Sequence, residues 1–296
     1  ANKIVAILGG KTPHIQNVAV GGVANPLAVD AQSVLTVERL MAIKGWIDKL
    51  EDFVKNVYLV DVAAIGAFYP EWTQIGRGIV DYLAAPDIPL DGKGETFALP
   101  GGHIADGDLG KFTRIRSFAD DYLLKGVSEA VKHSWYEYKA GDAASLHPYE
   151  GETAPRYTDF QDEGKYSWLK SPTLYGKPMQ VGPLARVLTM LAAGHEPTKK
   201  YATETLARVS SIAGIEVGLD AMHSTIGRHA ARAVSCAVQV DELAKQWDLL
   251  LANMAKGDLD TFNAPSFPRG EQRGMGFHEA PRGILSHWVV IEDGKI

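Results

Sequence analysis

The sequence has very little cysteine, no long apolar run and no cluster of basic residues. Cys236 is the only cysteine among 296 residues. This excludes an internal disulfide, a Cys-x-x-Cys zinc or redox site, and an iron–sulfur cluster held by this chain alone. No apolar stretch reaches the roughly 20 residues of a membrane-spanning helix, and no secretory signal is visible. The formal net charge of −6 argues against a nucleic-acid-binding protein.

What remains is the composition of an ordinary globular protein. Hydrophobic residues make up 46% of the chain and charged residues 22%. This length suggests one large or two ordinary domains and needs no disulfide or metal staple. The chain has no initiator Met, begins directly in an apolar run and stops one residue into an expected hairpin partner. We therefore expect residues 1–296 to be a single internal portion of a larger domain, without a clear boundary inside it.

The apolar run 4–8 and the glycines after it resemble the start of a phosphate-binding loop. Periodicity leaves open whether this run is a strand or the end of a helix that Gly9 and Gly10 terminate. The Walker pattern requires a glycine five residues before the glycine that precedes Lys11. Val5 occupies that position and would block the loop that cradles phosphate. The sequence thus argues against a P-loop nucleotide site.

The loop 11–26 combines two prolines, His14, Gln16, Asn17 and the pair Gly21-Gly22. Ordering such a loop is costly in conformational entropy, so it is either a functional site or a tightly packed corner. A lone histidine is more often a hydrogen-bonded structural residue than a ligand. The loop is a candidate site that the residues alone do not decide.

Apolar residues at helical spacing predict long helices. The expected helices are 30–70 with Thr36 as N-cap, 120–138, 183–193 with Pro183 in the first turn, 198–213 and 217–256. Residues 71–116 predict a loop-rich β layer, and 141–164 a polar insertion. We expect a mainly α fold with smaller β portions (α+β), in which a bundle of long helices carries peripheral loop-rich β layers.

A second row of side chains follows the rhythm of the longest expected helix on another face. It contains Arg228 and Arg232, one turn apart and close to Gly227. Such a row is either a solvated face or a place where arginine binds a carboxylate or a loop carbonyl.

The stretch 274–296 places Glu279, Pro281 and Arg282 in an unstructured approach to an apolar run. Residues 284–291 predict a largely buried strand, and the pair Asp293-Gly294 predicts a tight turn. Pro281 rigidifies the backbone before Arg282, so we expect a guanidinium with little rotamer freedom. Taken alone, these residues indicate a structural arginine that pairs with Glu279 or a backbone carbonyl.

Together, several motifs resemble the large subunit of nickel–iron hydrogenases of the uptake, respiratory type, across essentially the whole chain. Their order and separation match that family. The segments are GGKTPHIQNVAVGGVANP, HSWY, KSPTLYGKPMQVGPLAR, HSTIGRHAAR and EAPRGILSHW. The resemblance implies reversible oxidation of H₂ at a nickel–iron centre whose iron carries cyanide and carbonyl. In that family two Cys-x-x-Cys pairs hold the centre; this sequence contains neither pair, and Cys236 is not at a ligand position. Scattered His and carboxylates do not replace such a thiolate-rich site.

The resemblance also implies roles for single residues. Pro281 and Arg282 match the family's proline and arginine beside the metal centre, where the guanidinium would act as a fixed dipole on bound dihydrogen or as a base. Ala280 and Leu285 would wall that pocket, and His14 would face the nearest iron–sulfur cluster of the small subunit.

Two further positions carry over less directly. Lys170 matches a residue around the family's buried Mg²⁺ site. Gln180 stands where many relatives have Glu, so no charge role is carried over to it.

The implied partners are an iron–sulfur small subunit and, as a further candidate, a membrane cytochrome or quinone-linked subunit. The resemblance implies a periplasmic location with membrane association through these partners. The alternative interpretation is a metal-free scaffold subunit that kept this fold in a respiratory complex.

Overall fold

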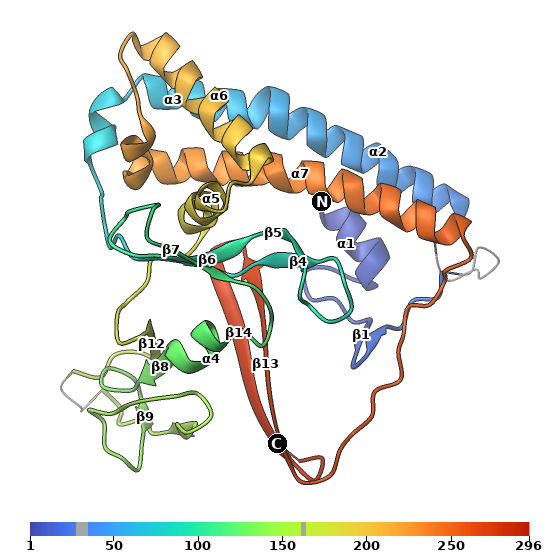
Figure 1. Ribbon diagram of the computed structural model, residues 1–296, viewed down its shortest axis with the longest axis vertical. Helices are drawn as coiled ribbons and strands as arrows, with labels where there is room; N and C mark the ends of the chain where they lie inside the picture. The colour runs from blue at the N-terminus through green and yellow to red at the C-terminus, as the bar shows by residue number, and fades with distance from the viewer. Residues whose placement is uncertain (28–34, 161–163, 296) are drawn as a thin grey trace. The chain divides into compact units, whose positions relative to one another are not determined.

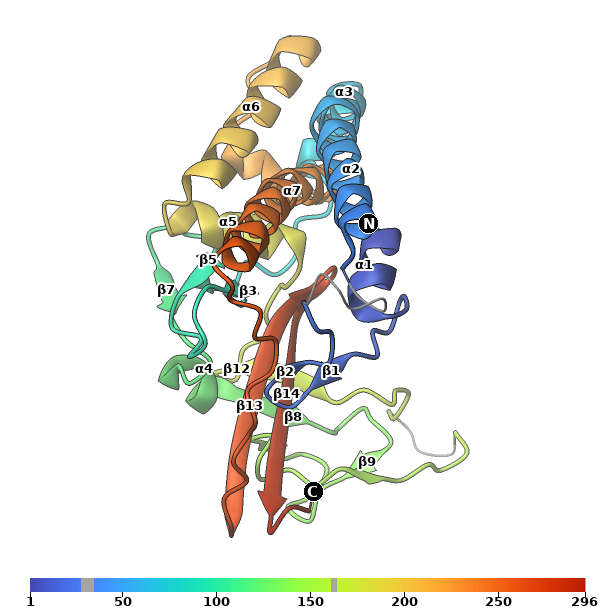
Figure 2. The same ribbon diagram turned by 90° about the vertical axis from the view of Figure 1, so that its right-hand side faces the viewer.

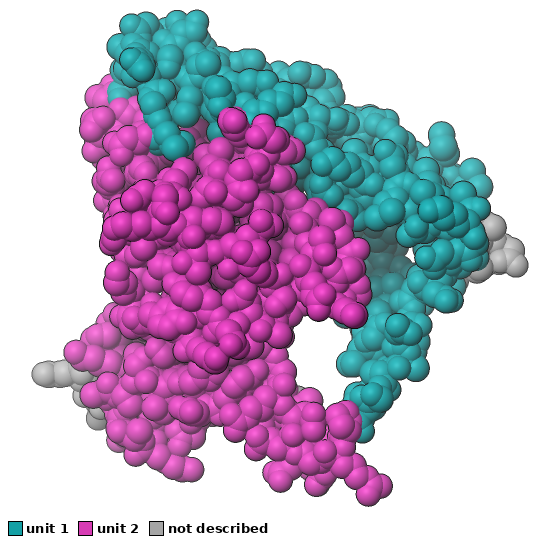
Figure 3. Space-filling model, in the orientation of Figure 1, with its two compact units in different colours: residues 1–70, 200–219, 232–267 teal, residues 71–199, 220–231, 268–296 magenta. Residues whose placement is uncertain are grey.

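The computed structural model describes residues 1–27, 35–160 and 164–295 (Figure 1). The chain forms two compact units, coloured separately in Figure 3. Unit 1 comprises residues 1–70, 200–219 and 232–267, and unit 2 comprises residues 71–199, 220–231 and 268–296. Each unit has its own core, so each is described by itself.

Unit 1 is helical. Its elements are α1 (Asn2–Gly9), the short hairpin β1 (Val18–Ala19) and β2 (Gly22–Val23), α2 (Val37–Phe53), the π-helical turn η1 (Val54–Tyr58), α3 (Leu59–Ala67), and most of α6 (Glu196–Ala213) and α7 (Thr225–Ala255). The run 4–8 is therefore a helix, which Gly10 ends in the left-handed region at φ 78°. Thr36 caps α2 as predicted, because its side chain accepts from Arg39 N. Residues 30–34 of that expected helix lie outside the described residues.

Helices α2 and α7 lie side by side in unit 1 (Figures 1 and 2). They share a buried cluster with α1 that contains Ile4, Leu40, Ile43, Ile47 and Trp247. Helix α7 begins at Thr225 rather than near 217, because a 3-10 turn, η3 (Leu219–His223), precedes it. Its 31 residues span about 46 Å, less than the sequence suggests.

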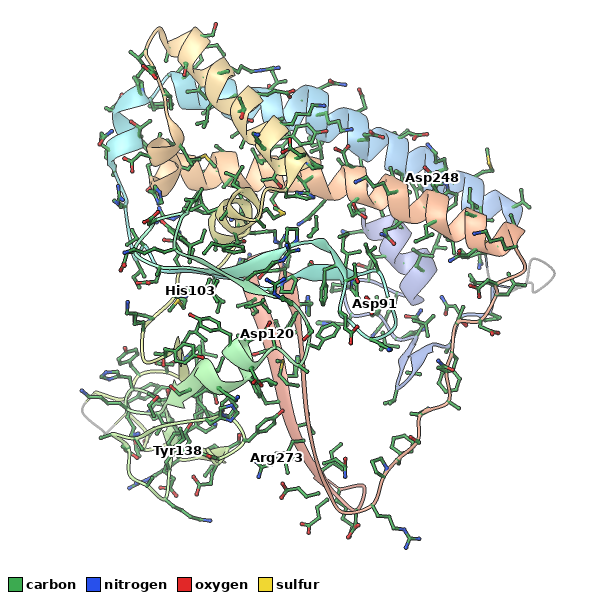
Figure 4. All side chains as sticks on the ribbon, in the orientation of Figure 1. Asp91, His103, Asp120, Tyr138, Asp248 and Arg273 are labelled. Carbon is green, nitrogen blue, oxygen red and sulfur yellow. The ribbon has the colours of Figure 1, made fainter. Side chains whose placement is uncertain are left out.

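Unit 2 contains small antiparallel sheets around one buried helix. The strands are β3 (Tyr82–Ala84), β6 (Gly101–Ile104) and β7 (Phe112–Ile115) in the order β3-β6-β7; β4 (Asp87–Pro89) with β5 (Phe97–Leu99); β8 (Val127–Ala130) between β10 (Ser145–Leu146) and β12 (Ser171–Leu174); and β9 (Tyr136–Glu137) with β11 (Ala154–Pro155). A 3-10 turn, η2 (Pro70–Gln74), leads into them. The loop between β4 and β5 is held by Asp91, labelled in Figure 4, whose carboxylate accepts three backbone N–H groups. The predicted loop-rich β layer over 71–116 is confirmed, as is the α+β class.

The expected helix 120–138 is wrong beyond its first turns. Asp120 caps α4 (Asp121–Gly126), and the chain then enters β8. A side chain at Gly126 would lie 2.6 Å from the Tyr175 ring, and Val127 pairs with Leu174 of β12. Strand pairing thus overrides helical spacing, since the partner strand lies more than 40 residues away in the sequence.

Helix α5 (Pro183–Ala192) forms the centre of unit 2. Pro183 stands at its start as predicted, and seven of its residues are buried. The helix packs on β3, β6 and β14. A second cluster of buried side chains, in the sheets and α4 of the same unit, consists of Leu83, Ala85, Ile115, Leu123, Leu174 and Phe277.

The last element is a long hairpin of β13 (Glu271–Ala280) and β14 (Gly283–Glu292). The expectation of an unstructured approach to the last strand is therefore wrong. The segment forms a strand in which the alternate residues Phe277 and Glu279 are buried, although glycines lie nearby. The last strand is also only half buried, and Leu285 is 42% exposed. Asp293 and Gly294 form the predicted turn with φ 48° and 80°, and Glu292 pairs with Lys295. Ile296, the expected continuation, lies outside the described residues.

Candidate functional site

The candidate site is the tip of the β13–β14 hairpin in unit 2. Ala280 pairs with Gly283, so Pro281 and Arg282 form a two-residue turn. Proline at the second position and glycine at the fourth favour a type I turn. The backbone twist of such a turn does not match the twist of the two strands. Gly283 accommodates this mismatch with a φ of 136°, which L side chains rarely adopt. The backbone that carries Arg282 is thus defined by its own sequence.

A buried ion pair fixes this tip to the body of the unit. The Glu279 side chain is fully buried; its Oε1 accepts from Ala85 N at 2.6 Å, and its Oε2 accepts from Arg186 Nη2 at 3.1 Å. Arg186 also donates to Ala280 O at 3.3 Å. Of the two pairings left open for Arg282, the one with Glu279 is therefore wrong, because the Glu279 carboxylate pairs with Arg186 on α5.

Burial and ion pairing act in opposite directions on the charges of Arg186 and Glu279. Arg186 lies in the first turn of α5, where the helix dipole disfavours a positive charge, and it is buried, so it needs a counter-charge. Burial raises the pKa of Glu279 to about 7, although Arg186 and Ala85 N–H act in the opposite direction. Both carboxylate oxygens accept hydrogen bonds, which is the pattern of the ionised form. The contacts of the pair therefore depend on a carboxylate that titrates near neutral pH.

Two glycines allow the segment before α5 to approach the tip backbone to backbone. A Cβ on Gly182, whose φ is 104°, would lie 3.0 Å from Arg282 O. A Cβ on Gly283 would lie 2.5 Å from Val181 Cγ2 and 3.0 Å from Gly182 N. A side chain at Gly283 would require Val181 to move, and both glycines have a φ that L side chains rarely adopt. Residues 181–182 thus support the turn directly.

The segment before α5 is anchored in turn by α7. With its amide oriented to suit its neighbours, Gln180 accepts from Arg228 Nε at 3.0 Å and donates to Ile79 O at 2.8 Å. Arg228 also donates to Gly76 O at 2.7 Å. Of the two interpretations of the second row on α7, binding of a loop carbonyl is therefore confirmed for Arg228. An ionised glutamate at position 180 would lose the donation to Ile79 O.

Arg282 itself is exposed, and its guanidinium makes no hydrogen bond or ion pair with any residue that the structure describes. The expected immobilised side chain is therefore not observed; only its backbone is held. Ala280 and Leu285 lie on one face of the hairpin, since His278 pairs with Leu285 and side chains alternate along each strand. That face is largely exposed, and Glu279 points to the other one. Pro281 and Arg282 thus lie at the tip of the hairpin, and Ala280 and Leu285 lie on one face of the strands next to it.

Two other predicted residues lie elsewhere. His14 is exposed in a loop of unit 1. Lys170, in unit 2, is 88% buried at its side chain; its Nζ lies 3.2 Å from Glu152 O, 3.5 Å from Glu129 Oε2 and over the ring of Tyr138 at 5.3 Å. These partners already satisfy its charge within the chain.

The residues of this chain do not fit a thiolate-held metal centre. Within the described ranges, no group of three or more His, Cys, Asp or Glu side chains could hold a metal ion. Cys236 lies half-buried on α7 in unit 1. No helix in the described part of the chain is both long and apolar enough to cross a membrane.

Neither Arg186 nor the role of Glu279 was predicted from the sequence. Arg186 is the only charged residue between Pro183 and Ala193. A single charge inside an apolar helix requires a buried partner, and this signal was available. Nothing in the sequence, however, identifies that partner, because Glu279 follows 93 residues later.

Comparisons with known proteins cover the whole chain. The family model for nickel-dependent hydrogenase matches residues 1–296. The chain is 52% identical to the Hydrogenase-2 large chain of Escherichia coli K12, with 100% of this chain and 52% of that protein covered. It is 37% identical to the uptake hydrogenase large subunit of Rhodobacter capsulatus, with coverage of 99% and 51%. The chain thus spans about half the length of the curated relatives it matches.

The fold also has a counterpart among solved structures. The reduced, active form of the Ni-Fe-Se hydrogenase from Desulfomicrobium baculatum superimposes with a TM-score of 0.77 at 27% identity. The match covers 99% of this chain and 54% of that one.

Proposed function

Because the chain belongs to the nickel-dependent hydrogenase family, we propose that it forms part of a catalytic large subunit that converts H₂ reversibly into protons and electrons. The observation that carries this proposal is the hairpin tip. An arginine with an exposed guanidinium stands on a turn whose backbone is fixed by a buried ion pair and two glycines. Both units, on this proposal, belong to one hydrogenase domain.

The role proposed for Arg282 is electrostatic. A guanidinium stays charged at all relevant pH values, and because the backbone of its turn is already in place, only side-chain torsions have to adjust before the charge stabilises the developing charge of the reaction. Pro281 restricts the turn, and Ala280 and Leu285 form the wall beside it on the same face. A nickel–iron centre with cyanide and carbonyl on the iron would be held by cysteines that these residues do not include, and it would supply the redox chemistry.

The partners proposed follow from the same family. His14, exposed on its loop, would face an iron–sulfur small subunit, and a hydrogen bond from it would tune the nearest cluster. Lys170, with its acidic neighbour Glu129, is proposed to lie beside a Mg²⁺ site. Electrons would pass on to a membrane cytochrome or quinone-linked subunit, in a complex attached to the periplasmic side of the membrane.

The test of the proposed role is Arg282→Lys in the complete heterodimer. Lysine keeps the charge but loses the planar fork, so we expect H₂ oxidation per nickel to fall by about 100-fold or more. Nickel and iron contents should stay normal. Arg273→Lys is the matched control, since Arg273 lies on the same hairpin, is half-exposed, pairs with Glu271 at 2.8 Å and lies over the ring of Tyr149 at 5.6 Å rather than at the turn. Undiminished turnover of Arg282→Lys would refute the proposed role.

The alternative function is that of a metal-free scaffold subunit that kept this fold in a respiratory complex. Nickel and iron analysis of the purified complex separates the two functions. Stoichiometric nickel supports the enzyme, and a complex without nickel that retains its partners supports the scaffold.

A further inference from the structure

We propose that Arg186 and Glu279 are positioning residues, which set the place of the Arg282 turn relative to α5 without touching the reacting atoms. This inference rests on the proposed function, because it assigns a task to the site of Arg282. It concerns residues to which neither the motif resemblance nor the comparisons assign a role.

The contacts of Arg186 lie directly beside the turn. Glu279 and Ala280 are the last residues of β13, immediately before the turn, and both accept from the Arg186 guanidinium. The second oxygen of Glu279 is held by Ala85 N at 2.6 Å. One strand end is thereby tied to two separate parts of unit 2, which fixes both its position and its orientation.

The ion pair of Arg186 and Glu279 is buried, so its formation requires the desolvation of two charges. Both side chains are nearly or fully buried, with exposed fractions of 7% and 0%. A buried ion pair is often no more stabilising than an apolar pair of similar volume. A contribution to stability is therefore a weak explanation for this ion pair. The more direct consequence of its contacts is that they fix the position of the turn.

The turn is also in contact with the segment that precedes α5. Gly182 and Val181 abut Arg282 O and Gly283, so the turn is held between the ion pair and the segment before α5. Because the backbone of the turn is held on both sides, the exposed Arg282 guanidinium can move only by rotation about its side-chain torsions. This suits a group that must meet a small substrate in one geometry, where a displacement of about 1 Å can lower turnover by roughly 100-fold.

The experiment uses the complete heterodimer and compares Glu279→Gln, Arg186→Met and Val181→Ala. Each should lower kcat for H₂ oxidation per nickel by about tenfold or more, with the KM for H₂ unchanged, because positioning acts on the transition state. Val181→Ala removes a contact of the half-exposed segment without disturbing the buried charges, so it remains informative if the other variants fail to fold.

A matched control separates positioning from stability. Lys165 is also buried, donates to three backbone carbonyls and pairs with Asp142 at 2.8 Å, away from the turn. Lys165→Met should lower the melting temperature but leave kcat per nickel unchanged. An equal loss of kcat in this control would overturn the proposal.

A double-mutant cycle tests whether the pair acts through Arg282. In an Arg282→Lys background, Glu279→Gln should change residual turnover by less than about threefold, since coupled residues are not additive. A full, additive loss would overturn the positioning role. If Arg282→Lys is slow while Glu279→Gln and Val181→Ala are fully active, only the present inference fails. If Arg282→Lys itself is fully active, the proposed function of Arg282 fails first.

Discussion

At the scale of single residues, Glu279 links the geometry of the site to pH. Its pKa is raised from 4.5 to about 7, chiefly because burial disfavours the charged form. Between these values the folded protein holds a proton that the unfolded chain has released. The contribution of Glu279 to stability is therefore complete below about pH 4.5 and is lost as the pH rises through 7.

This predicts a measurable difference between the protein and its Glu279→Gln variant. The free energy of unfolding of the unmodified protein should decline from pH 5 to pH 8 by up to about 3 kcal/mol more than that of the variant. Chemical denaturation at several pH values measures both curves. Parallel curves would show that Glu279 keeps an ordinary pKa in the folded state.

The residues of the site divide into those that local sequence defines and those that it does not. The Pro281–Arg282 turn is a local feature that the proline and Gly283 favour, although the prediction for this segment was an unstructured approach. The Arg186–Glu279 pair depends on burial and on contacts across 93 residues. Proximity of this kind arises only from the packed fold, so the sequence led to the wrong partner for Glu279.

At the scale of elements, residues typical of helix starts predicted where two of the helices begin. Thr36 and Pro183 mark the starts of α2 and α5 correctly. The helix expected after Asp120 is wrong because residues of β8 pair with β12 instead. Strand β13 was not predicted because its glycines interrupt the alternating pattern to which Phe277 and Glu279 belong. Strands depend on partners, and partners are not visible in a single segment.

Two helical glycines predict opposite effects of the same substitution. A Cβ on Gly227, in the first turn of α7, would lie 2.4 Å from the backbone of Ala221 and Met222, whereas a Cβ on Gly45 in α2 meets nothing within 4 Å. Gly227→Ala should destabilise by roughly 1–3 kcal/mol or more through overpacking. Gly45→Ala should stabilise by about 0.5–1 kcal/mol, because alanine favours a helix interior. Thermal unfolding of both variants measures the signs, and equal signs would contradict this account.

At the scale of the whole molecule, the family and the α+β class were within reach of the sequence, because motif order and helical spacing persist over the full length. The division into two units was not, since unit 1 draws on three separated ranges. The metal ligands are a different matter. The chain spans about half of its relatives, and its described residues do not form a metal site.

A substitution of the single thiol tests this separation of roles. Cys236→Ser in the complete heterodimer should leave nickel and iron contents and H₂ oxidation within about twofold of the original. The reason is that Cys236 is half-buried on α7, and no group of metal-binding side chains forms in the described part of the chain. Loss of nickel on this change would place a ligand on α7.

The sequence distances within the ion pair also bear on the order of folding. The β13–β14 hairpin closes on itself through neighbouring residues, whereas Glu279 meets Arg186 across 93 positions and Ala85 across 194. Closing longer loops carries a larger entropic penalty, so contacts of this kind form late. We therefore expect the hairpin to exist before it is anchored, and the arginine at its tip to reach its final place only in the last stage of folding.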